Sequence, residues 1–262
     1  MGDETGGAVA QRRDRFGRRR SRALAVALVT VVGFVASACA GAAVVAPLDP
    51  SFQAYAVTDN RPDAYAVTGE GEQVHVRAAA DNTGGNTRVV FWPKDEVPTT
   101  DQQVCATWRS SSFDFRQEGL ALRLHFEEGD GQAILITKNV WLNRFSTFNV
   151  SRWRASDAPQ AITLLQAFDL SNALGQGDGL APLPWRICAR VVDATVSFVV
   201  WPLAEARPAW GDPAHGGSVA VPEDLMAPGV GAFYIGHVQP GQEVVYDGLA
   251  VGAPGAGDTD PT

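Results

Sequence analysis

Apolar and polar residues alternate along short stretches of this chain, with the two-residue period of β-strands rather than the 3.6-residue period of helices. Residues 103–108 place Val104, Ala106 and Trp108 on one strand face and polar side chains or Cys on the other. Residues 120–126 repeat this pattern, with four apolar side chains on one face. No run of a dozen residues combines an apolar stripe of helical spacing with helix caps. We therefore expect a chain built from strands.

Gly, Pro, Asn and Asp residues separate these stretches at short intervals. Two pairs of stretches, residues 120–126 with 133–138 and residues 185–192 with 195–201, flank short turns and predict β-hairpins. The further expected strands cover residues 73–78, 88–92, 103–108, 141–150, 161–169, 219–221, 231–237 and 243–251.

The sequence Ala-Tyr-Ala-Val-Thr occurs at residues 54–58 and again at 64–68, around a turn that contains Asp and Pro, and predicts a third hairpin. Short strands separated by turn residues are typical of antiparallel β-sandwiches. The chain is therefore expected to be all-β, with one antiparallel two-sheet β-sandwich over residues 50–252. Residues 253–262 are rich in Gly and Pro and predict a disordered tail.

The pattern is different near the N-terminus. Residues 1–22 contain seven Arg and three acidic residues, and residues 23–48 contain no charged residue. An Arg-rich segment followed by an apolar core is typical of a signal peptide, which we expect to cover residues 1–38. The core ends in Ala-Ser-Ala followed by Cys39, which resembles the lipobox of bacterial lipoproteins. The resemblance implies that Cys39 is lipidated and that residues 39–49 link a membrane lipid anchor to the sandwich.

Two alternatives remain open for this segment. Residues 23–45 are long and apolar enough to stay uncut as a membrane anchor, and the segment could also be an ordinary cleaved signal. All three readings place the chain from about residue 48 onward outside the cytoplasm, because the Arg-rich flank stays inside.

Charge narrows the choice of partners. Removal of residues 1–38 takes the formal net charge from −8 to −12, because that segment carries seven Arg and three acidic residues. An acidic domain is a poor nucleic-acid binder and does not adsorb electrostatically to an anionic membrane. The excess of Arg over Lys, with abundant Ala, Val and Gly, is typical of a high-GC source such as an actinobacterium. No pattern specifies an oligomeric state.

The cysteines predict one disulfide. Three Cys are present, and with Cys39 as the lipid site, Cys105 and Cys188 remain as a pair in an oxidising compartment. Disulfides need Cα atoms about 5.5 Å apart, which suits neighbouring strands better than two sheets about 10 Å apart. We therefore expect Cys105 and Cys188 to lie on adjacent strands of one sheet.

The predicted disulfide would bring basic side chains together. Three Arg alternate onto the same strand faces as the two Cys, and an Arg and a His from residues 120–126 could join that sheet. These candidates are Arg109, Arg186, Arg190, Arg123 and His125. Guanidinium groups bind oxygens and stack on aromatic rings, so this face is a candidate site for an anionic or polyhydroxyl ligand. The alternative is ion pairing with the surplus acidic residues on an ordinary solvated face.

Seven Trp residues are many for a domain of this size. Alternation assigns three of them, Trp108, Trp185 and Trp201, to the sandwich core. Three others, Trp141, Trp153 and Trp210, lie at predicted strand ends or loops and are candidate platforms for sugar rings, although core packing is the commoner role of Trp.

Recognisable catalytic and metal-binding motifs are absent from the sequence. It contains no Gly-x-Ser-x-Gly, His-Glu-x-x-His, phosphate loop or calcium loop, and its four His are scattered. The acidic group at residues 127–130 lies in a predicted turn, where carboxylates are usually solvated. We therefore predict no catalytic residue, no metal ligand and no cofactor, with calcium left open.

The C-terminal third resembles a known family. The strand Trp-Arg-Ile-Cys-Ala-Arg at 185–190, the strand ending at Trp201, the Gly-rich strand at 229–236 and the strand around Asp247 follow one another as in concanavalin A-like lectin/glucanase (laminin-G-like, jelly-roll) domains. The resemblance covers about residues 180–252. It implies two packed sheets, one of them concave, with carbohydrate binding as a common activity.

These observations together lead to one expectation. The chain is expected to be an extracytoplasmic cell-envelope lipoprotein that binds carbohydrate or cell-wall polysaccharide through the concave sheet, without catalysis. The Glu-x-Asp-x-x-Glu motif of laminarinase-type hydrolases is absent. A glycoside hydrolase or lyase with an unrecognised site, and a structural envelope protein that binds another protein, are the alternatives.

Overall fold

The computed structural model describes most of the chain beyond the N-terminal segment. The described ranges are residues 48–58, 64–81, 87–111, 116–127, 130–141 and 144–258. The expected signal peptide, Cys39 and the linker up to residue 47 lie outside them, as do residues 259–262. Within the described ranges, no helix is long and apolar enough to cross a membrane.

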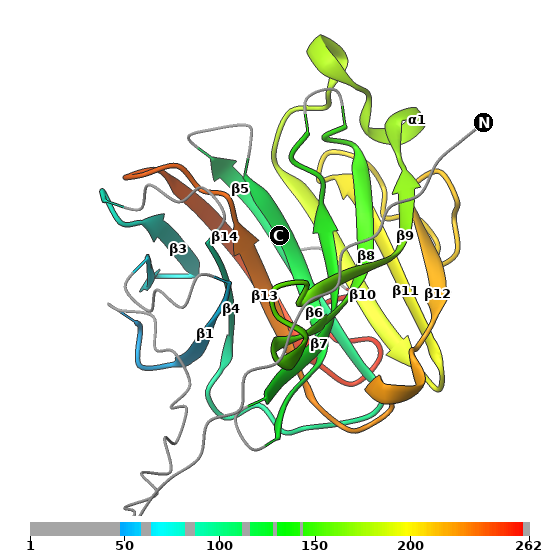
Figure 1. The fold of residues 1–262 in the computed structure, drawn as a ribbon. Helices are drawn as coiled ribbons and strands as arrows, with labels where there is room; N and C mark the ends of the chain where they lie inside the picture. Colours follow the sequence, from blue (N-terminus) through cyan, green and yellow to red (C-terminus); the bar gives the residue numbers. More distant parts are fainter. Residues whose placement is uncertain are drawn as a thin grey trace, which may run out of the picture. The chain divides into compact units, whose positions relative to one another are not determined.

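Two antiparallel seven-stranded sheets pack face to face (Figure 1). The first sheet has the order β1 (Phe52–Thr58), β4 (Arg88–Pro93), β13 (Val230–Gly236), β6 (Gln117–Glu127), β7 (Asp130–Lys138), β8 (Thr147–Arg154) and β9 (Ile162–Asp169). The second sheet has the order β12 (Gly216–Ala220), β11 (Thr195–Pro202), β10 (Trp185–Val192), β5 (Gln102–Ser111), β14 (Glu243–Gly252), β3 (Gln73–Ala78) and β2 (Tyr65–Glu70). The predicted all-β sandwich is confirmed.

Short helical turns connect some of the strands. They are α1 (Ser171–Leu174), η1 (Ala155–Asp157), η2 (Gly177–Gly179) and η3 (Glu223–Leu225). The hairpins β6–β7 and β10–β11 form as predicted, the second with Val192 opposite Thr195. The expected strand at 141–150 is shorter than predicted, because β8 begins at Thr147.

The expected hairpin between the two Ala-Tyr-Ala-Val-Thr copies does not form. β1 pairs with β4 in the first sheet, and β2 pairs with β3 in the second. Tyr65 and Val67 point into the core between the sheets, whereas Tyr55 and Val57 pack on the outer face of the first sheet. Identical alternation is compatible with burial on either face, so the repeat alone does not define which strands pair.

The core between the sheets comes from the inward positions of both. Trp108 and Trp185 lie in it as predicted, and Trp108 stacks on Phe148 with ring centroids 6.1 Å apart. Trp201 is also buried, but on the outer face of the second sheet beside the two Cys. It alternates with Val196, Phe198 and Val200, which take the inward positions of β11.

The predicted disordered tail differs from the structure in its first part. Residues 253–258 fold back against the outer face of the second sheet, where Gln103, Arg186 and Arg207 bind them. These hydrogen bonds provide the order that the Gly- and Pro-rich composition alone does not predict.

Candidate binding groove on the first sheet

The predicted disulfide is confirmed. Cys105 of β5 and Cys188 of β10 are bonded, with their Cα atoms 4.1 Å apart and the two residues directly opposite each other in the register. Arg186 and Arg190 lie on the same face of β10 as Cys188, as alternation predicts. We call the outer surface of the second sheet around the disulfide the cystine face.

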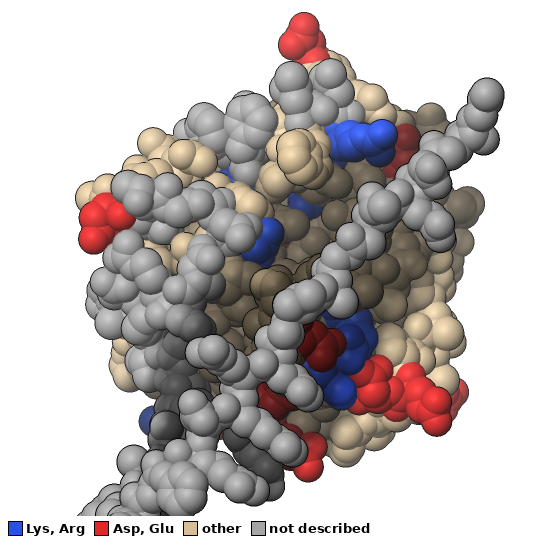
Figure 2. All heavy atoms as spheres, in the orientation of Figure 1, with Lys and Arg blue, Asp and Glu red and all other residues tan. Residues whose placement is uncertain are grey.

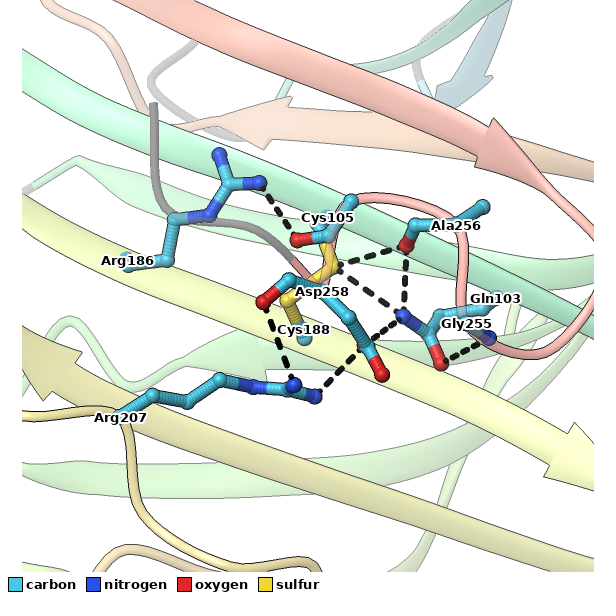
Figure 3. A network of polar contacts seen from close by, with 9 residues as sticks. Gln103, Cys105, Arg186, Cys188, Arg207, Gly255, Ala256 and Asp258 are labelled. Carbon is cyan, nitrogen blue, oxygen red and sulfur yellow. Dashed lines mark hydrogen bonds and ion pairs between the residues drawn. A yellow bond between two sulfur atoms is a disulfide. The ribbon is translucent and has the colours of Figure 1, made fainter. Parts of the chain in front are cut away.

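Part of the cystine face is covered by the chain itself (Figure 3), which corrects the expectation that Arg186 faces a ligand. Arg186 is 1% exposed and donates hydrogen bonds to Thr107 Oγ1 at 3.0 Å and to the carbonyl oxygens of Gly248 at 2.7 Å and Gly257 at 3.1 Å. Its guanidinium therefore binds oxygens, as predicted, but these belong to the chain itself.

The candidate platform Trp210 is also engaged within the chain. The Arg190 guanidinium carbon lies 4.3 Å from the centre of the Trp210 ring, and that of Arg207 lies 5.3 Å from it. Two cation–π contacts of this kind stabilise the packing of the 203–215 loop on β10. Arg190 and Trp210, which the sequence offered as separate ligand contacts, thus contact each other.

Arg109 and His125 do not join the arginines of the cystine face. The Arg109 guanidinium pairs with Asp247 of β14, at the end of β5. His125 belongs to β6, which pairs with β13 and β7 in the first sheet. The expectation that residues 120–126 share a sheet with the disulfide is therefore wrong.

Arg123 has a structural role at one end of the sandwich. It is 2% exposed, sits in the irregular part of β6 with φ at +51°, and donates to the carbonyl oxygens of Thr100, Leu225 and Asp193 at 2.8–3.0 Å. Burial lowers the pKa of the Arg123 guanidinium from its ordinary value, while the charge of Asp101 acts in the opposite direction. Arg123 thus ties together three connections between strands.

The other two candidate platforms have opposite environments. Trp153 is completely buried on the outer face of the first sheet, where it packs over Gly131 and lies 5.7 Å from the Tyr55 ring. Trp141, in the connection between β7 and β8, is 72% exposed. Of the three candidates, only Trp141 is largely exposed, whereas Trp210 is partly buried.

An open groove of about 450 Å³ lies on the outer face of the first sheet. Polar side chains from six neighbouring strands line its floor, and the segment 159–164 lines one side with apolar side chains and Gln160. The polar residues of the floor are Thr58, Arg88, Gln117, Thr137, Asn149, Ser151 and Tyr234. The described residues that line the groove include no Asp or Glu. In Figure 2 acidic side chains lie at the margins of the visible surface and beside a basic cluster in the lower half of the view.

Gln117 is the centre of a hydrogen-bond network in this groove. Its Oε1 accepts from the Tyr234 hydroxyl at 2.8 Å and from Arg88 Nε at 3.2 Å, and its Nε2 donates to Thr137 Oγ1 at 3.4 Å. Arg88 also contacts His237 Nε2 at 2.9 Å. Burial raises the pKa of the Tyr234 hydroxyl above its ordinary range, so this group remains a donor at neutral pH. The network holds the polar side chains of the groove in fixed orientations.

Two glycines make room for this arrangement. A Cβ on Gly236 would lie 2.8 Å from Arg88 Cγ, and a Cβ on Gly119 would lie 2.3 Å from the carbonyl oxygen of Ile136.

Sequence reasoning missed the groove, although Gln117, Thr137 and Asn149 occupy outward positions of strands with apolar inward positions. Only the order β4-β13-β6-β7-β8, which joins strands far apart in sequence, brings them together.

No metal site accompanies the groove. Within the described ranges, no group of three or more His, Cys, Asp or Glu residues gathers closely enough to hold a metal ion. The hydroxyl, amide and guanidinium groups of the groove do not form the carboxylate-rich set that Ca²⁺ prefers. We therefore derive no role for calcium in this groove.

Comparison with known proteins adds no family. Neither a protein-family model nor a curated protein matches the sequence. Among solved structures, the chain is similar to a Bacillus subtilis protein of unknown function with a galectin-like fold, at 12% identity over 76% of this chain and 88% of that one, with a TM-score of 0.44. It is also similar to the exoplasmic/lumenal domain of VIP36 in a form bound to Ca²⁺ and Man3GlcNAc, at 10% identity over 79% and 88% of the two chains, with a TM-score of 0.44. At this distance, neither a ligand nor a metal can be transferred to this chain.

Proposed function

We propose that the groove on the first sheet binds a neutral polysaccharide without catalysis, in a lectin-like domain held outside the cytoplasm. The observation that carries the proposal is the Gln117 network, which fixes amide, hydroxyl and guanidinium groups on an open sheet face. Sugar hydroxyls donate and accept hydrogen bonds, so they match side chains of both kinds. Fixed side chains also lose less rotamer freedom when a ligand binds.

The side of the groove supplies a second kind of contact. Pro159, Ile162 and Leu164 line it, and Leu164 is 56% exposed. Apolar side chains of this kind can pack against the C–H groups of a sugar ring. A neutral ligand is favoured over an acidic one, because the guanidinium of Arg88 already contacts Gln117, His237 and Thr58.

Replacing Gln117 by Ala should weaken polysaccharide binding about tenfold or more. The change removes the shared acceptor that orients Tyr234 and Arg88 and also an amide that a sugar hydroxyl could bind, and a tenfold loss of affinity corresponds to about 1.4 kcal/mol, the range of one or two hydrogen bonds. Isothermal titration of the purified domain with neutral and acidic cell-wall and plant polysaccharides, with analysis of reducing ends, measures both affinity and cleavage.

The exposed Gln73 of β3 provides a matched control, since Gln73→Ala alters the same residue type on the other sheet. We expect wild-type affinity from Gln73→Ala and no new reducing ends from any variant. Loss of binding in Trp141→Ala with normal binding in Gln117→Ala would place the site on the β7–β8 connection instead. Released oligosaccharides would show an enzyme, and an absence of binding to every polysaccharide would favour a protein partner.

The membrane anchor is a separate part of the proposal, and it rests on the lipobox-like residues before Cys39. Mass analysis of the membrane-bound protein from a bacterial host should find an N-terminal Cys39 that carries a diacylglyceryl group. Cys39→Ala should abolish the modification and leave the precursor uncleaved. An intact N-terminus in the wild type would indicate an uncut anchor, and a cleaved but unmodified protein would indicate simple secretion.

A further inference from the structure

The segment 253–258 crosses the cystine face directly over the disulfide (Figure 3). Positive φ values at Gly255 (+103°) and Gly257 (+71°) allow its turn back from the end of β14. Such φ values are accessible to Gly at little steric cost. We call this segment the strap.

The strap is held by a buried amide. Gln103 is 0% exposed, and its Oε1 accepts from the Gly255 backbone N–H at 3.0 Å. Its Nε2 donates to the Ala256 carbonyl at 2.6 Å and also contacts the Asp258 carboxylate. One side chain of β5 thus binds three successive parts of the strap.

Asp258 holds the C-terminal end of the strap through its ion pair with Arg207, and we call this pair the latch. Arg207 Nη2 donates to Asp258 Oδ1 at 2.7 Å, and Arg186 Nη2 donates to the Gly257 carbonyl at 3.1 Å. Burial by itself would raise the pKa of Asp258. The hydrogen bonds from Gln103 and Arg207 and the charges of Arg207 and Arg190 outweigh burial, so the pKa of this carboxyl lies below its ordinary value.

The strap leaves little space above the sulfur atoms. Cys105 and Cys188 are both 0% exposed, and the Ala256 carbonyl oxygen lies 3.5 Å from Cys105 Sγ. A Cβ on Gly257 would lie 3.0 Å from Cys105 Cβ and 2.7 Å from the Ala250 Cβ. A thiolate from solution therefore has no approach to either sulfur while the strap is in place.

We propose that the strap is a lock on the Cys105–Cys188 disulfide, which a dithiol reductant can reach only after the strap has lifted. In the reaction, a reductant thiolate bonds to one cystine sulfur as the S–S bond breaks, and the other sulfur leaves as a thiolate that takes up a proton. The second reductant thiol then closes the reductant's own disulfide and releases the remaining Cys as a thiol. The proposal is independent of the polysaccharide site.

Removal of the latch should accelerate reduction. We expect dithiothreitol at pH 8 to reduce Asp258→Asn at least about tenfold faster than the wild type, as measured by alkylation and mass analysis under native conditions. The matched control is Asp212→Asn, which removes an acidic group from the 203–215 loop, where Asp212 pairs with His215 and does not touch the strap. The control should react at the wild-type rate.

A second variant keeps the test decisive. Gly257→Val cannot fit beneath Arg186 and above Cys105, so it should lift the strap and react faster still. Near-UV circular dichroism and urea unfolding of each variant separate local opening from global unfolding. Equal reduction rates in the wild type, Asp258→Asn and Gly257→Val, or rates that follow only global stability, would overturn the proposal.

The latch also has a defined pH dependence. The pKa of Asp258 is lowered in the folded chain. The stability that Asp258 gives to the closed strap is therefore complete above the ordinary carboxyl pKa and is lost as pH falls through the lowered value. The groups that face this carboxylate are Arg207, Arg190 and Gln103, and Arg186 of β10 binds the neighbouring Gly257. The protection factors of the amides in residues 253–258, which correct the exchange rates for their intrinsic pH dependence, should therefore fall in acid in the wild type, while Asp258→Asn should show low protection at every pH. Wild-type protection factors that do not change with pH would contradict the latch.

Discussion

Arg123→Met should lower the free energy of unfolding by about 3–4 kcal/mol, although Arg123 lies outside the groove. The variant keeps a long apolar stem but removes the donors to Thr100, Leu225 and Asp193. The Leu225 carbonyl is buried and costs about 1–3 kcal/mol when it loses its donor, and each of the part-buried hydrogen bonds to Thr100 and Asp193 contributes about 0.5–1.5 kcal/mol more. Urea unfolding followed by Trp fluorescence measures the change, since Trp108, Trp153 and Trp201 are all buried.

The matched control for Arg123 is Arg152→Met. Arg152 pairs with Asp157 and Asp224 near the surface, where ion pairs contribute about 0–1 kcal/mol. Arg123→Met should retain wild-type polysaccharide affinity at temperatures where it stays folded. A variant of normal stability with lost affinity would instead return Arg123 to the binding site, where its residue type first suggested it belonged.

Alternation within single strands was enough to predict most of the fold. The faces of β5, β6 and β10 follow directly from their two-residue period, and the disulfide follows from the shared compartment and geometry of Cys105 and Cys188. These predictions depend on local pattern and covalent geometry. Strand pairing is different, because the AYAVT repeat has the same pattern in two strands that belong to opposite sheets.

The candidate site was harder to predict for the same reason. Arg186 and Arg190 were correctly placed with the disulfide, but the strap that covers Arg186 comes from residues about 70 positions later in the chain. The Gln117 network joins residues from β4, β13, β6 and β7, which are adjacent only in the folded sheet. Residue type indicates which groups a side chain can bind. The folded topology decides whether those groups come from a ligand or from the chain itself.

Removal of the disulfide should produce the largest loss of stability. The two cysteines are 83 residues apart, and a closed loop of that length restricts the unfolded chain by about 4.5 kcal/mol. The double variant Cys105→Ala, Cys188→Ala should therefore lose about 4–5 kcal/mol in urea unfolding, with a slope that reflects a more expanded unfolded state. Thiol counting under denaturing, non-reducing conditions should find neither Cys105 nor Cys188 reactive in the wild type.

A comparison of Asp258→Asn with the double Cys variant separates the stability that the disulfide provides from the stability that the strap provides. Asp258→Asn keeps the covalent bond and loses only the latch, so it should cost far less stability than the double Cys variant. Reduction of Asp258→Asn by dithiothreitol should then bring its stability close to that of the double variant, because both chains have lost the same loop constraint. The contrary result is a double Cys variant that unfolds at the same urea concentration as the wild type. In that case the disulfide would order only the cystine face, and its protection by the strap would not affect the free energy of unfolding.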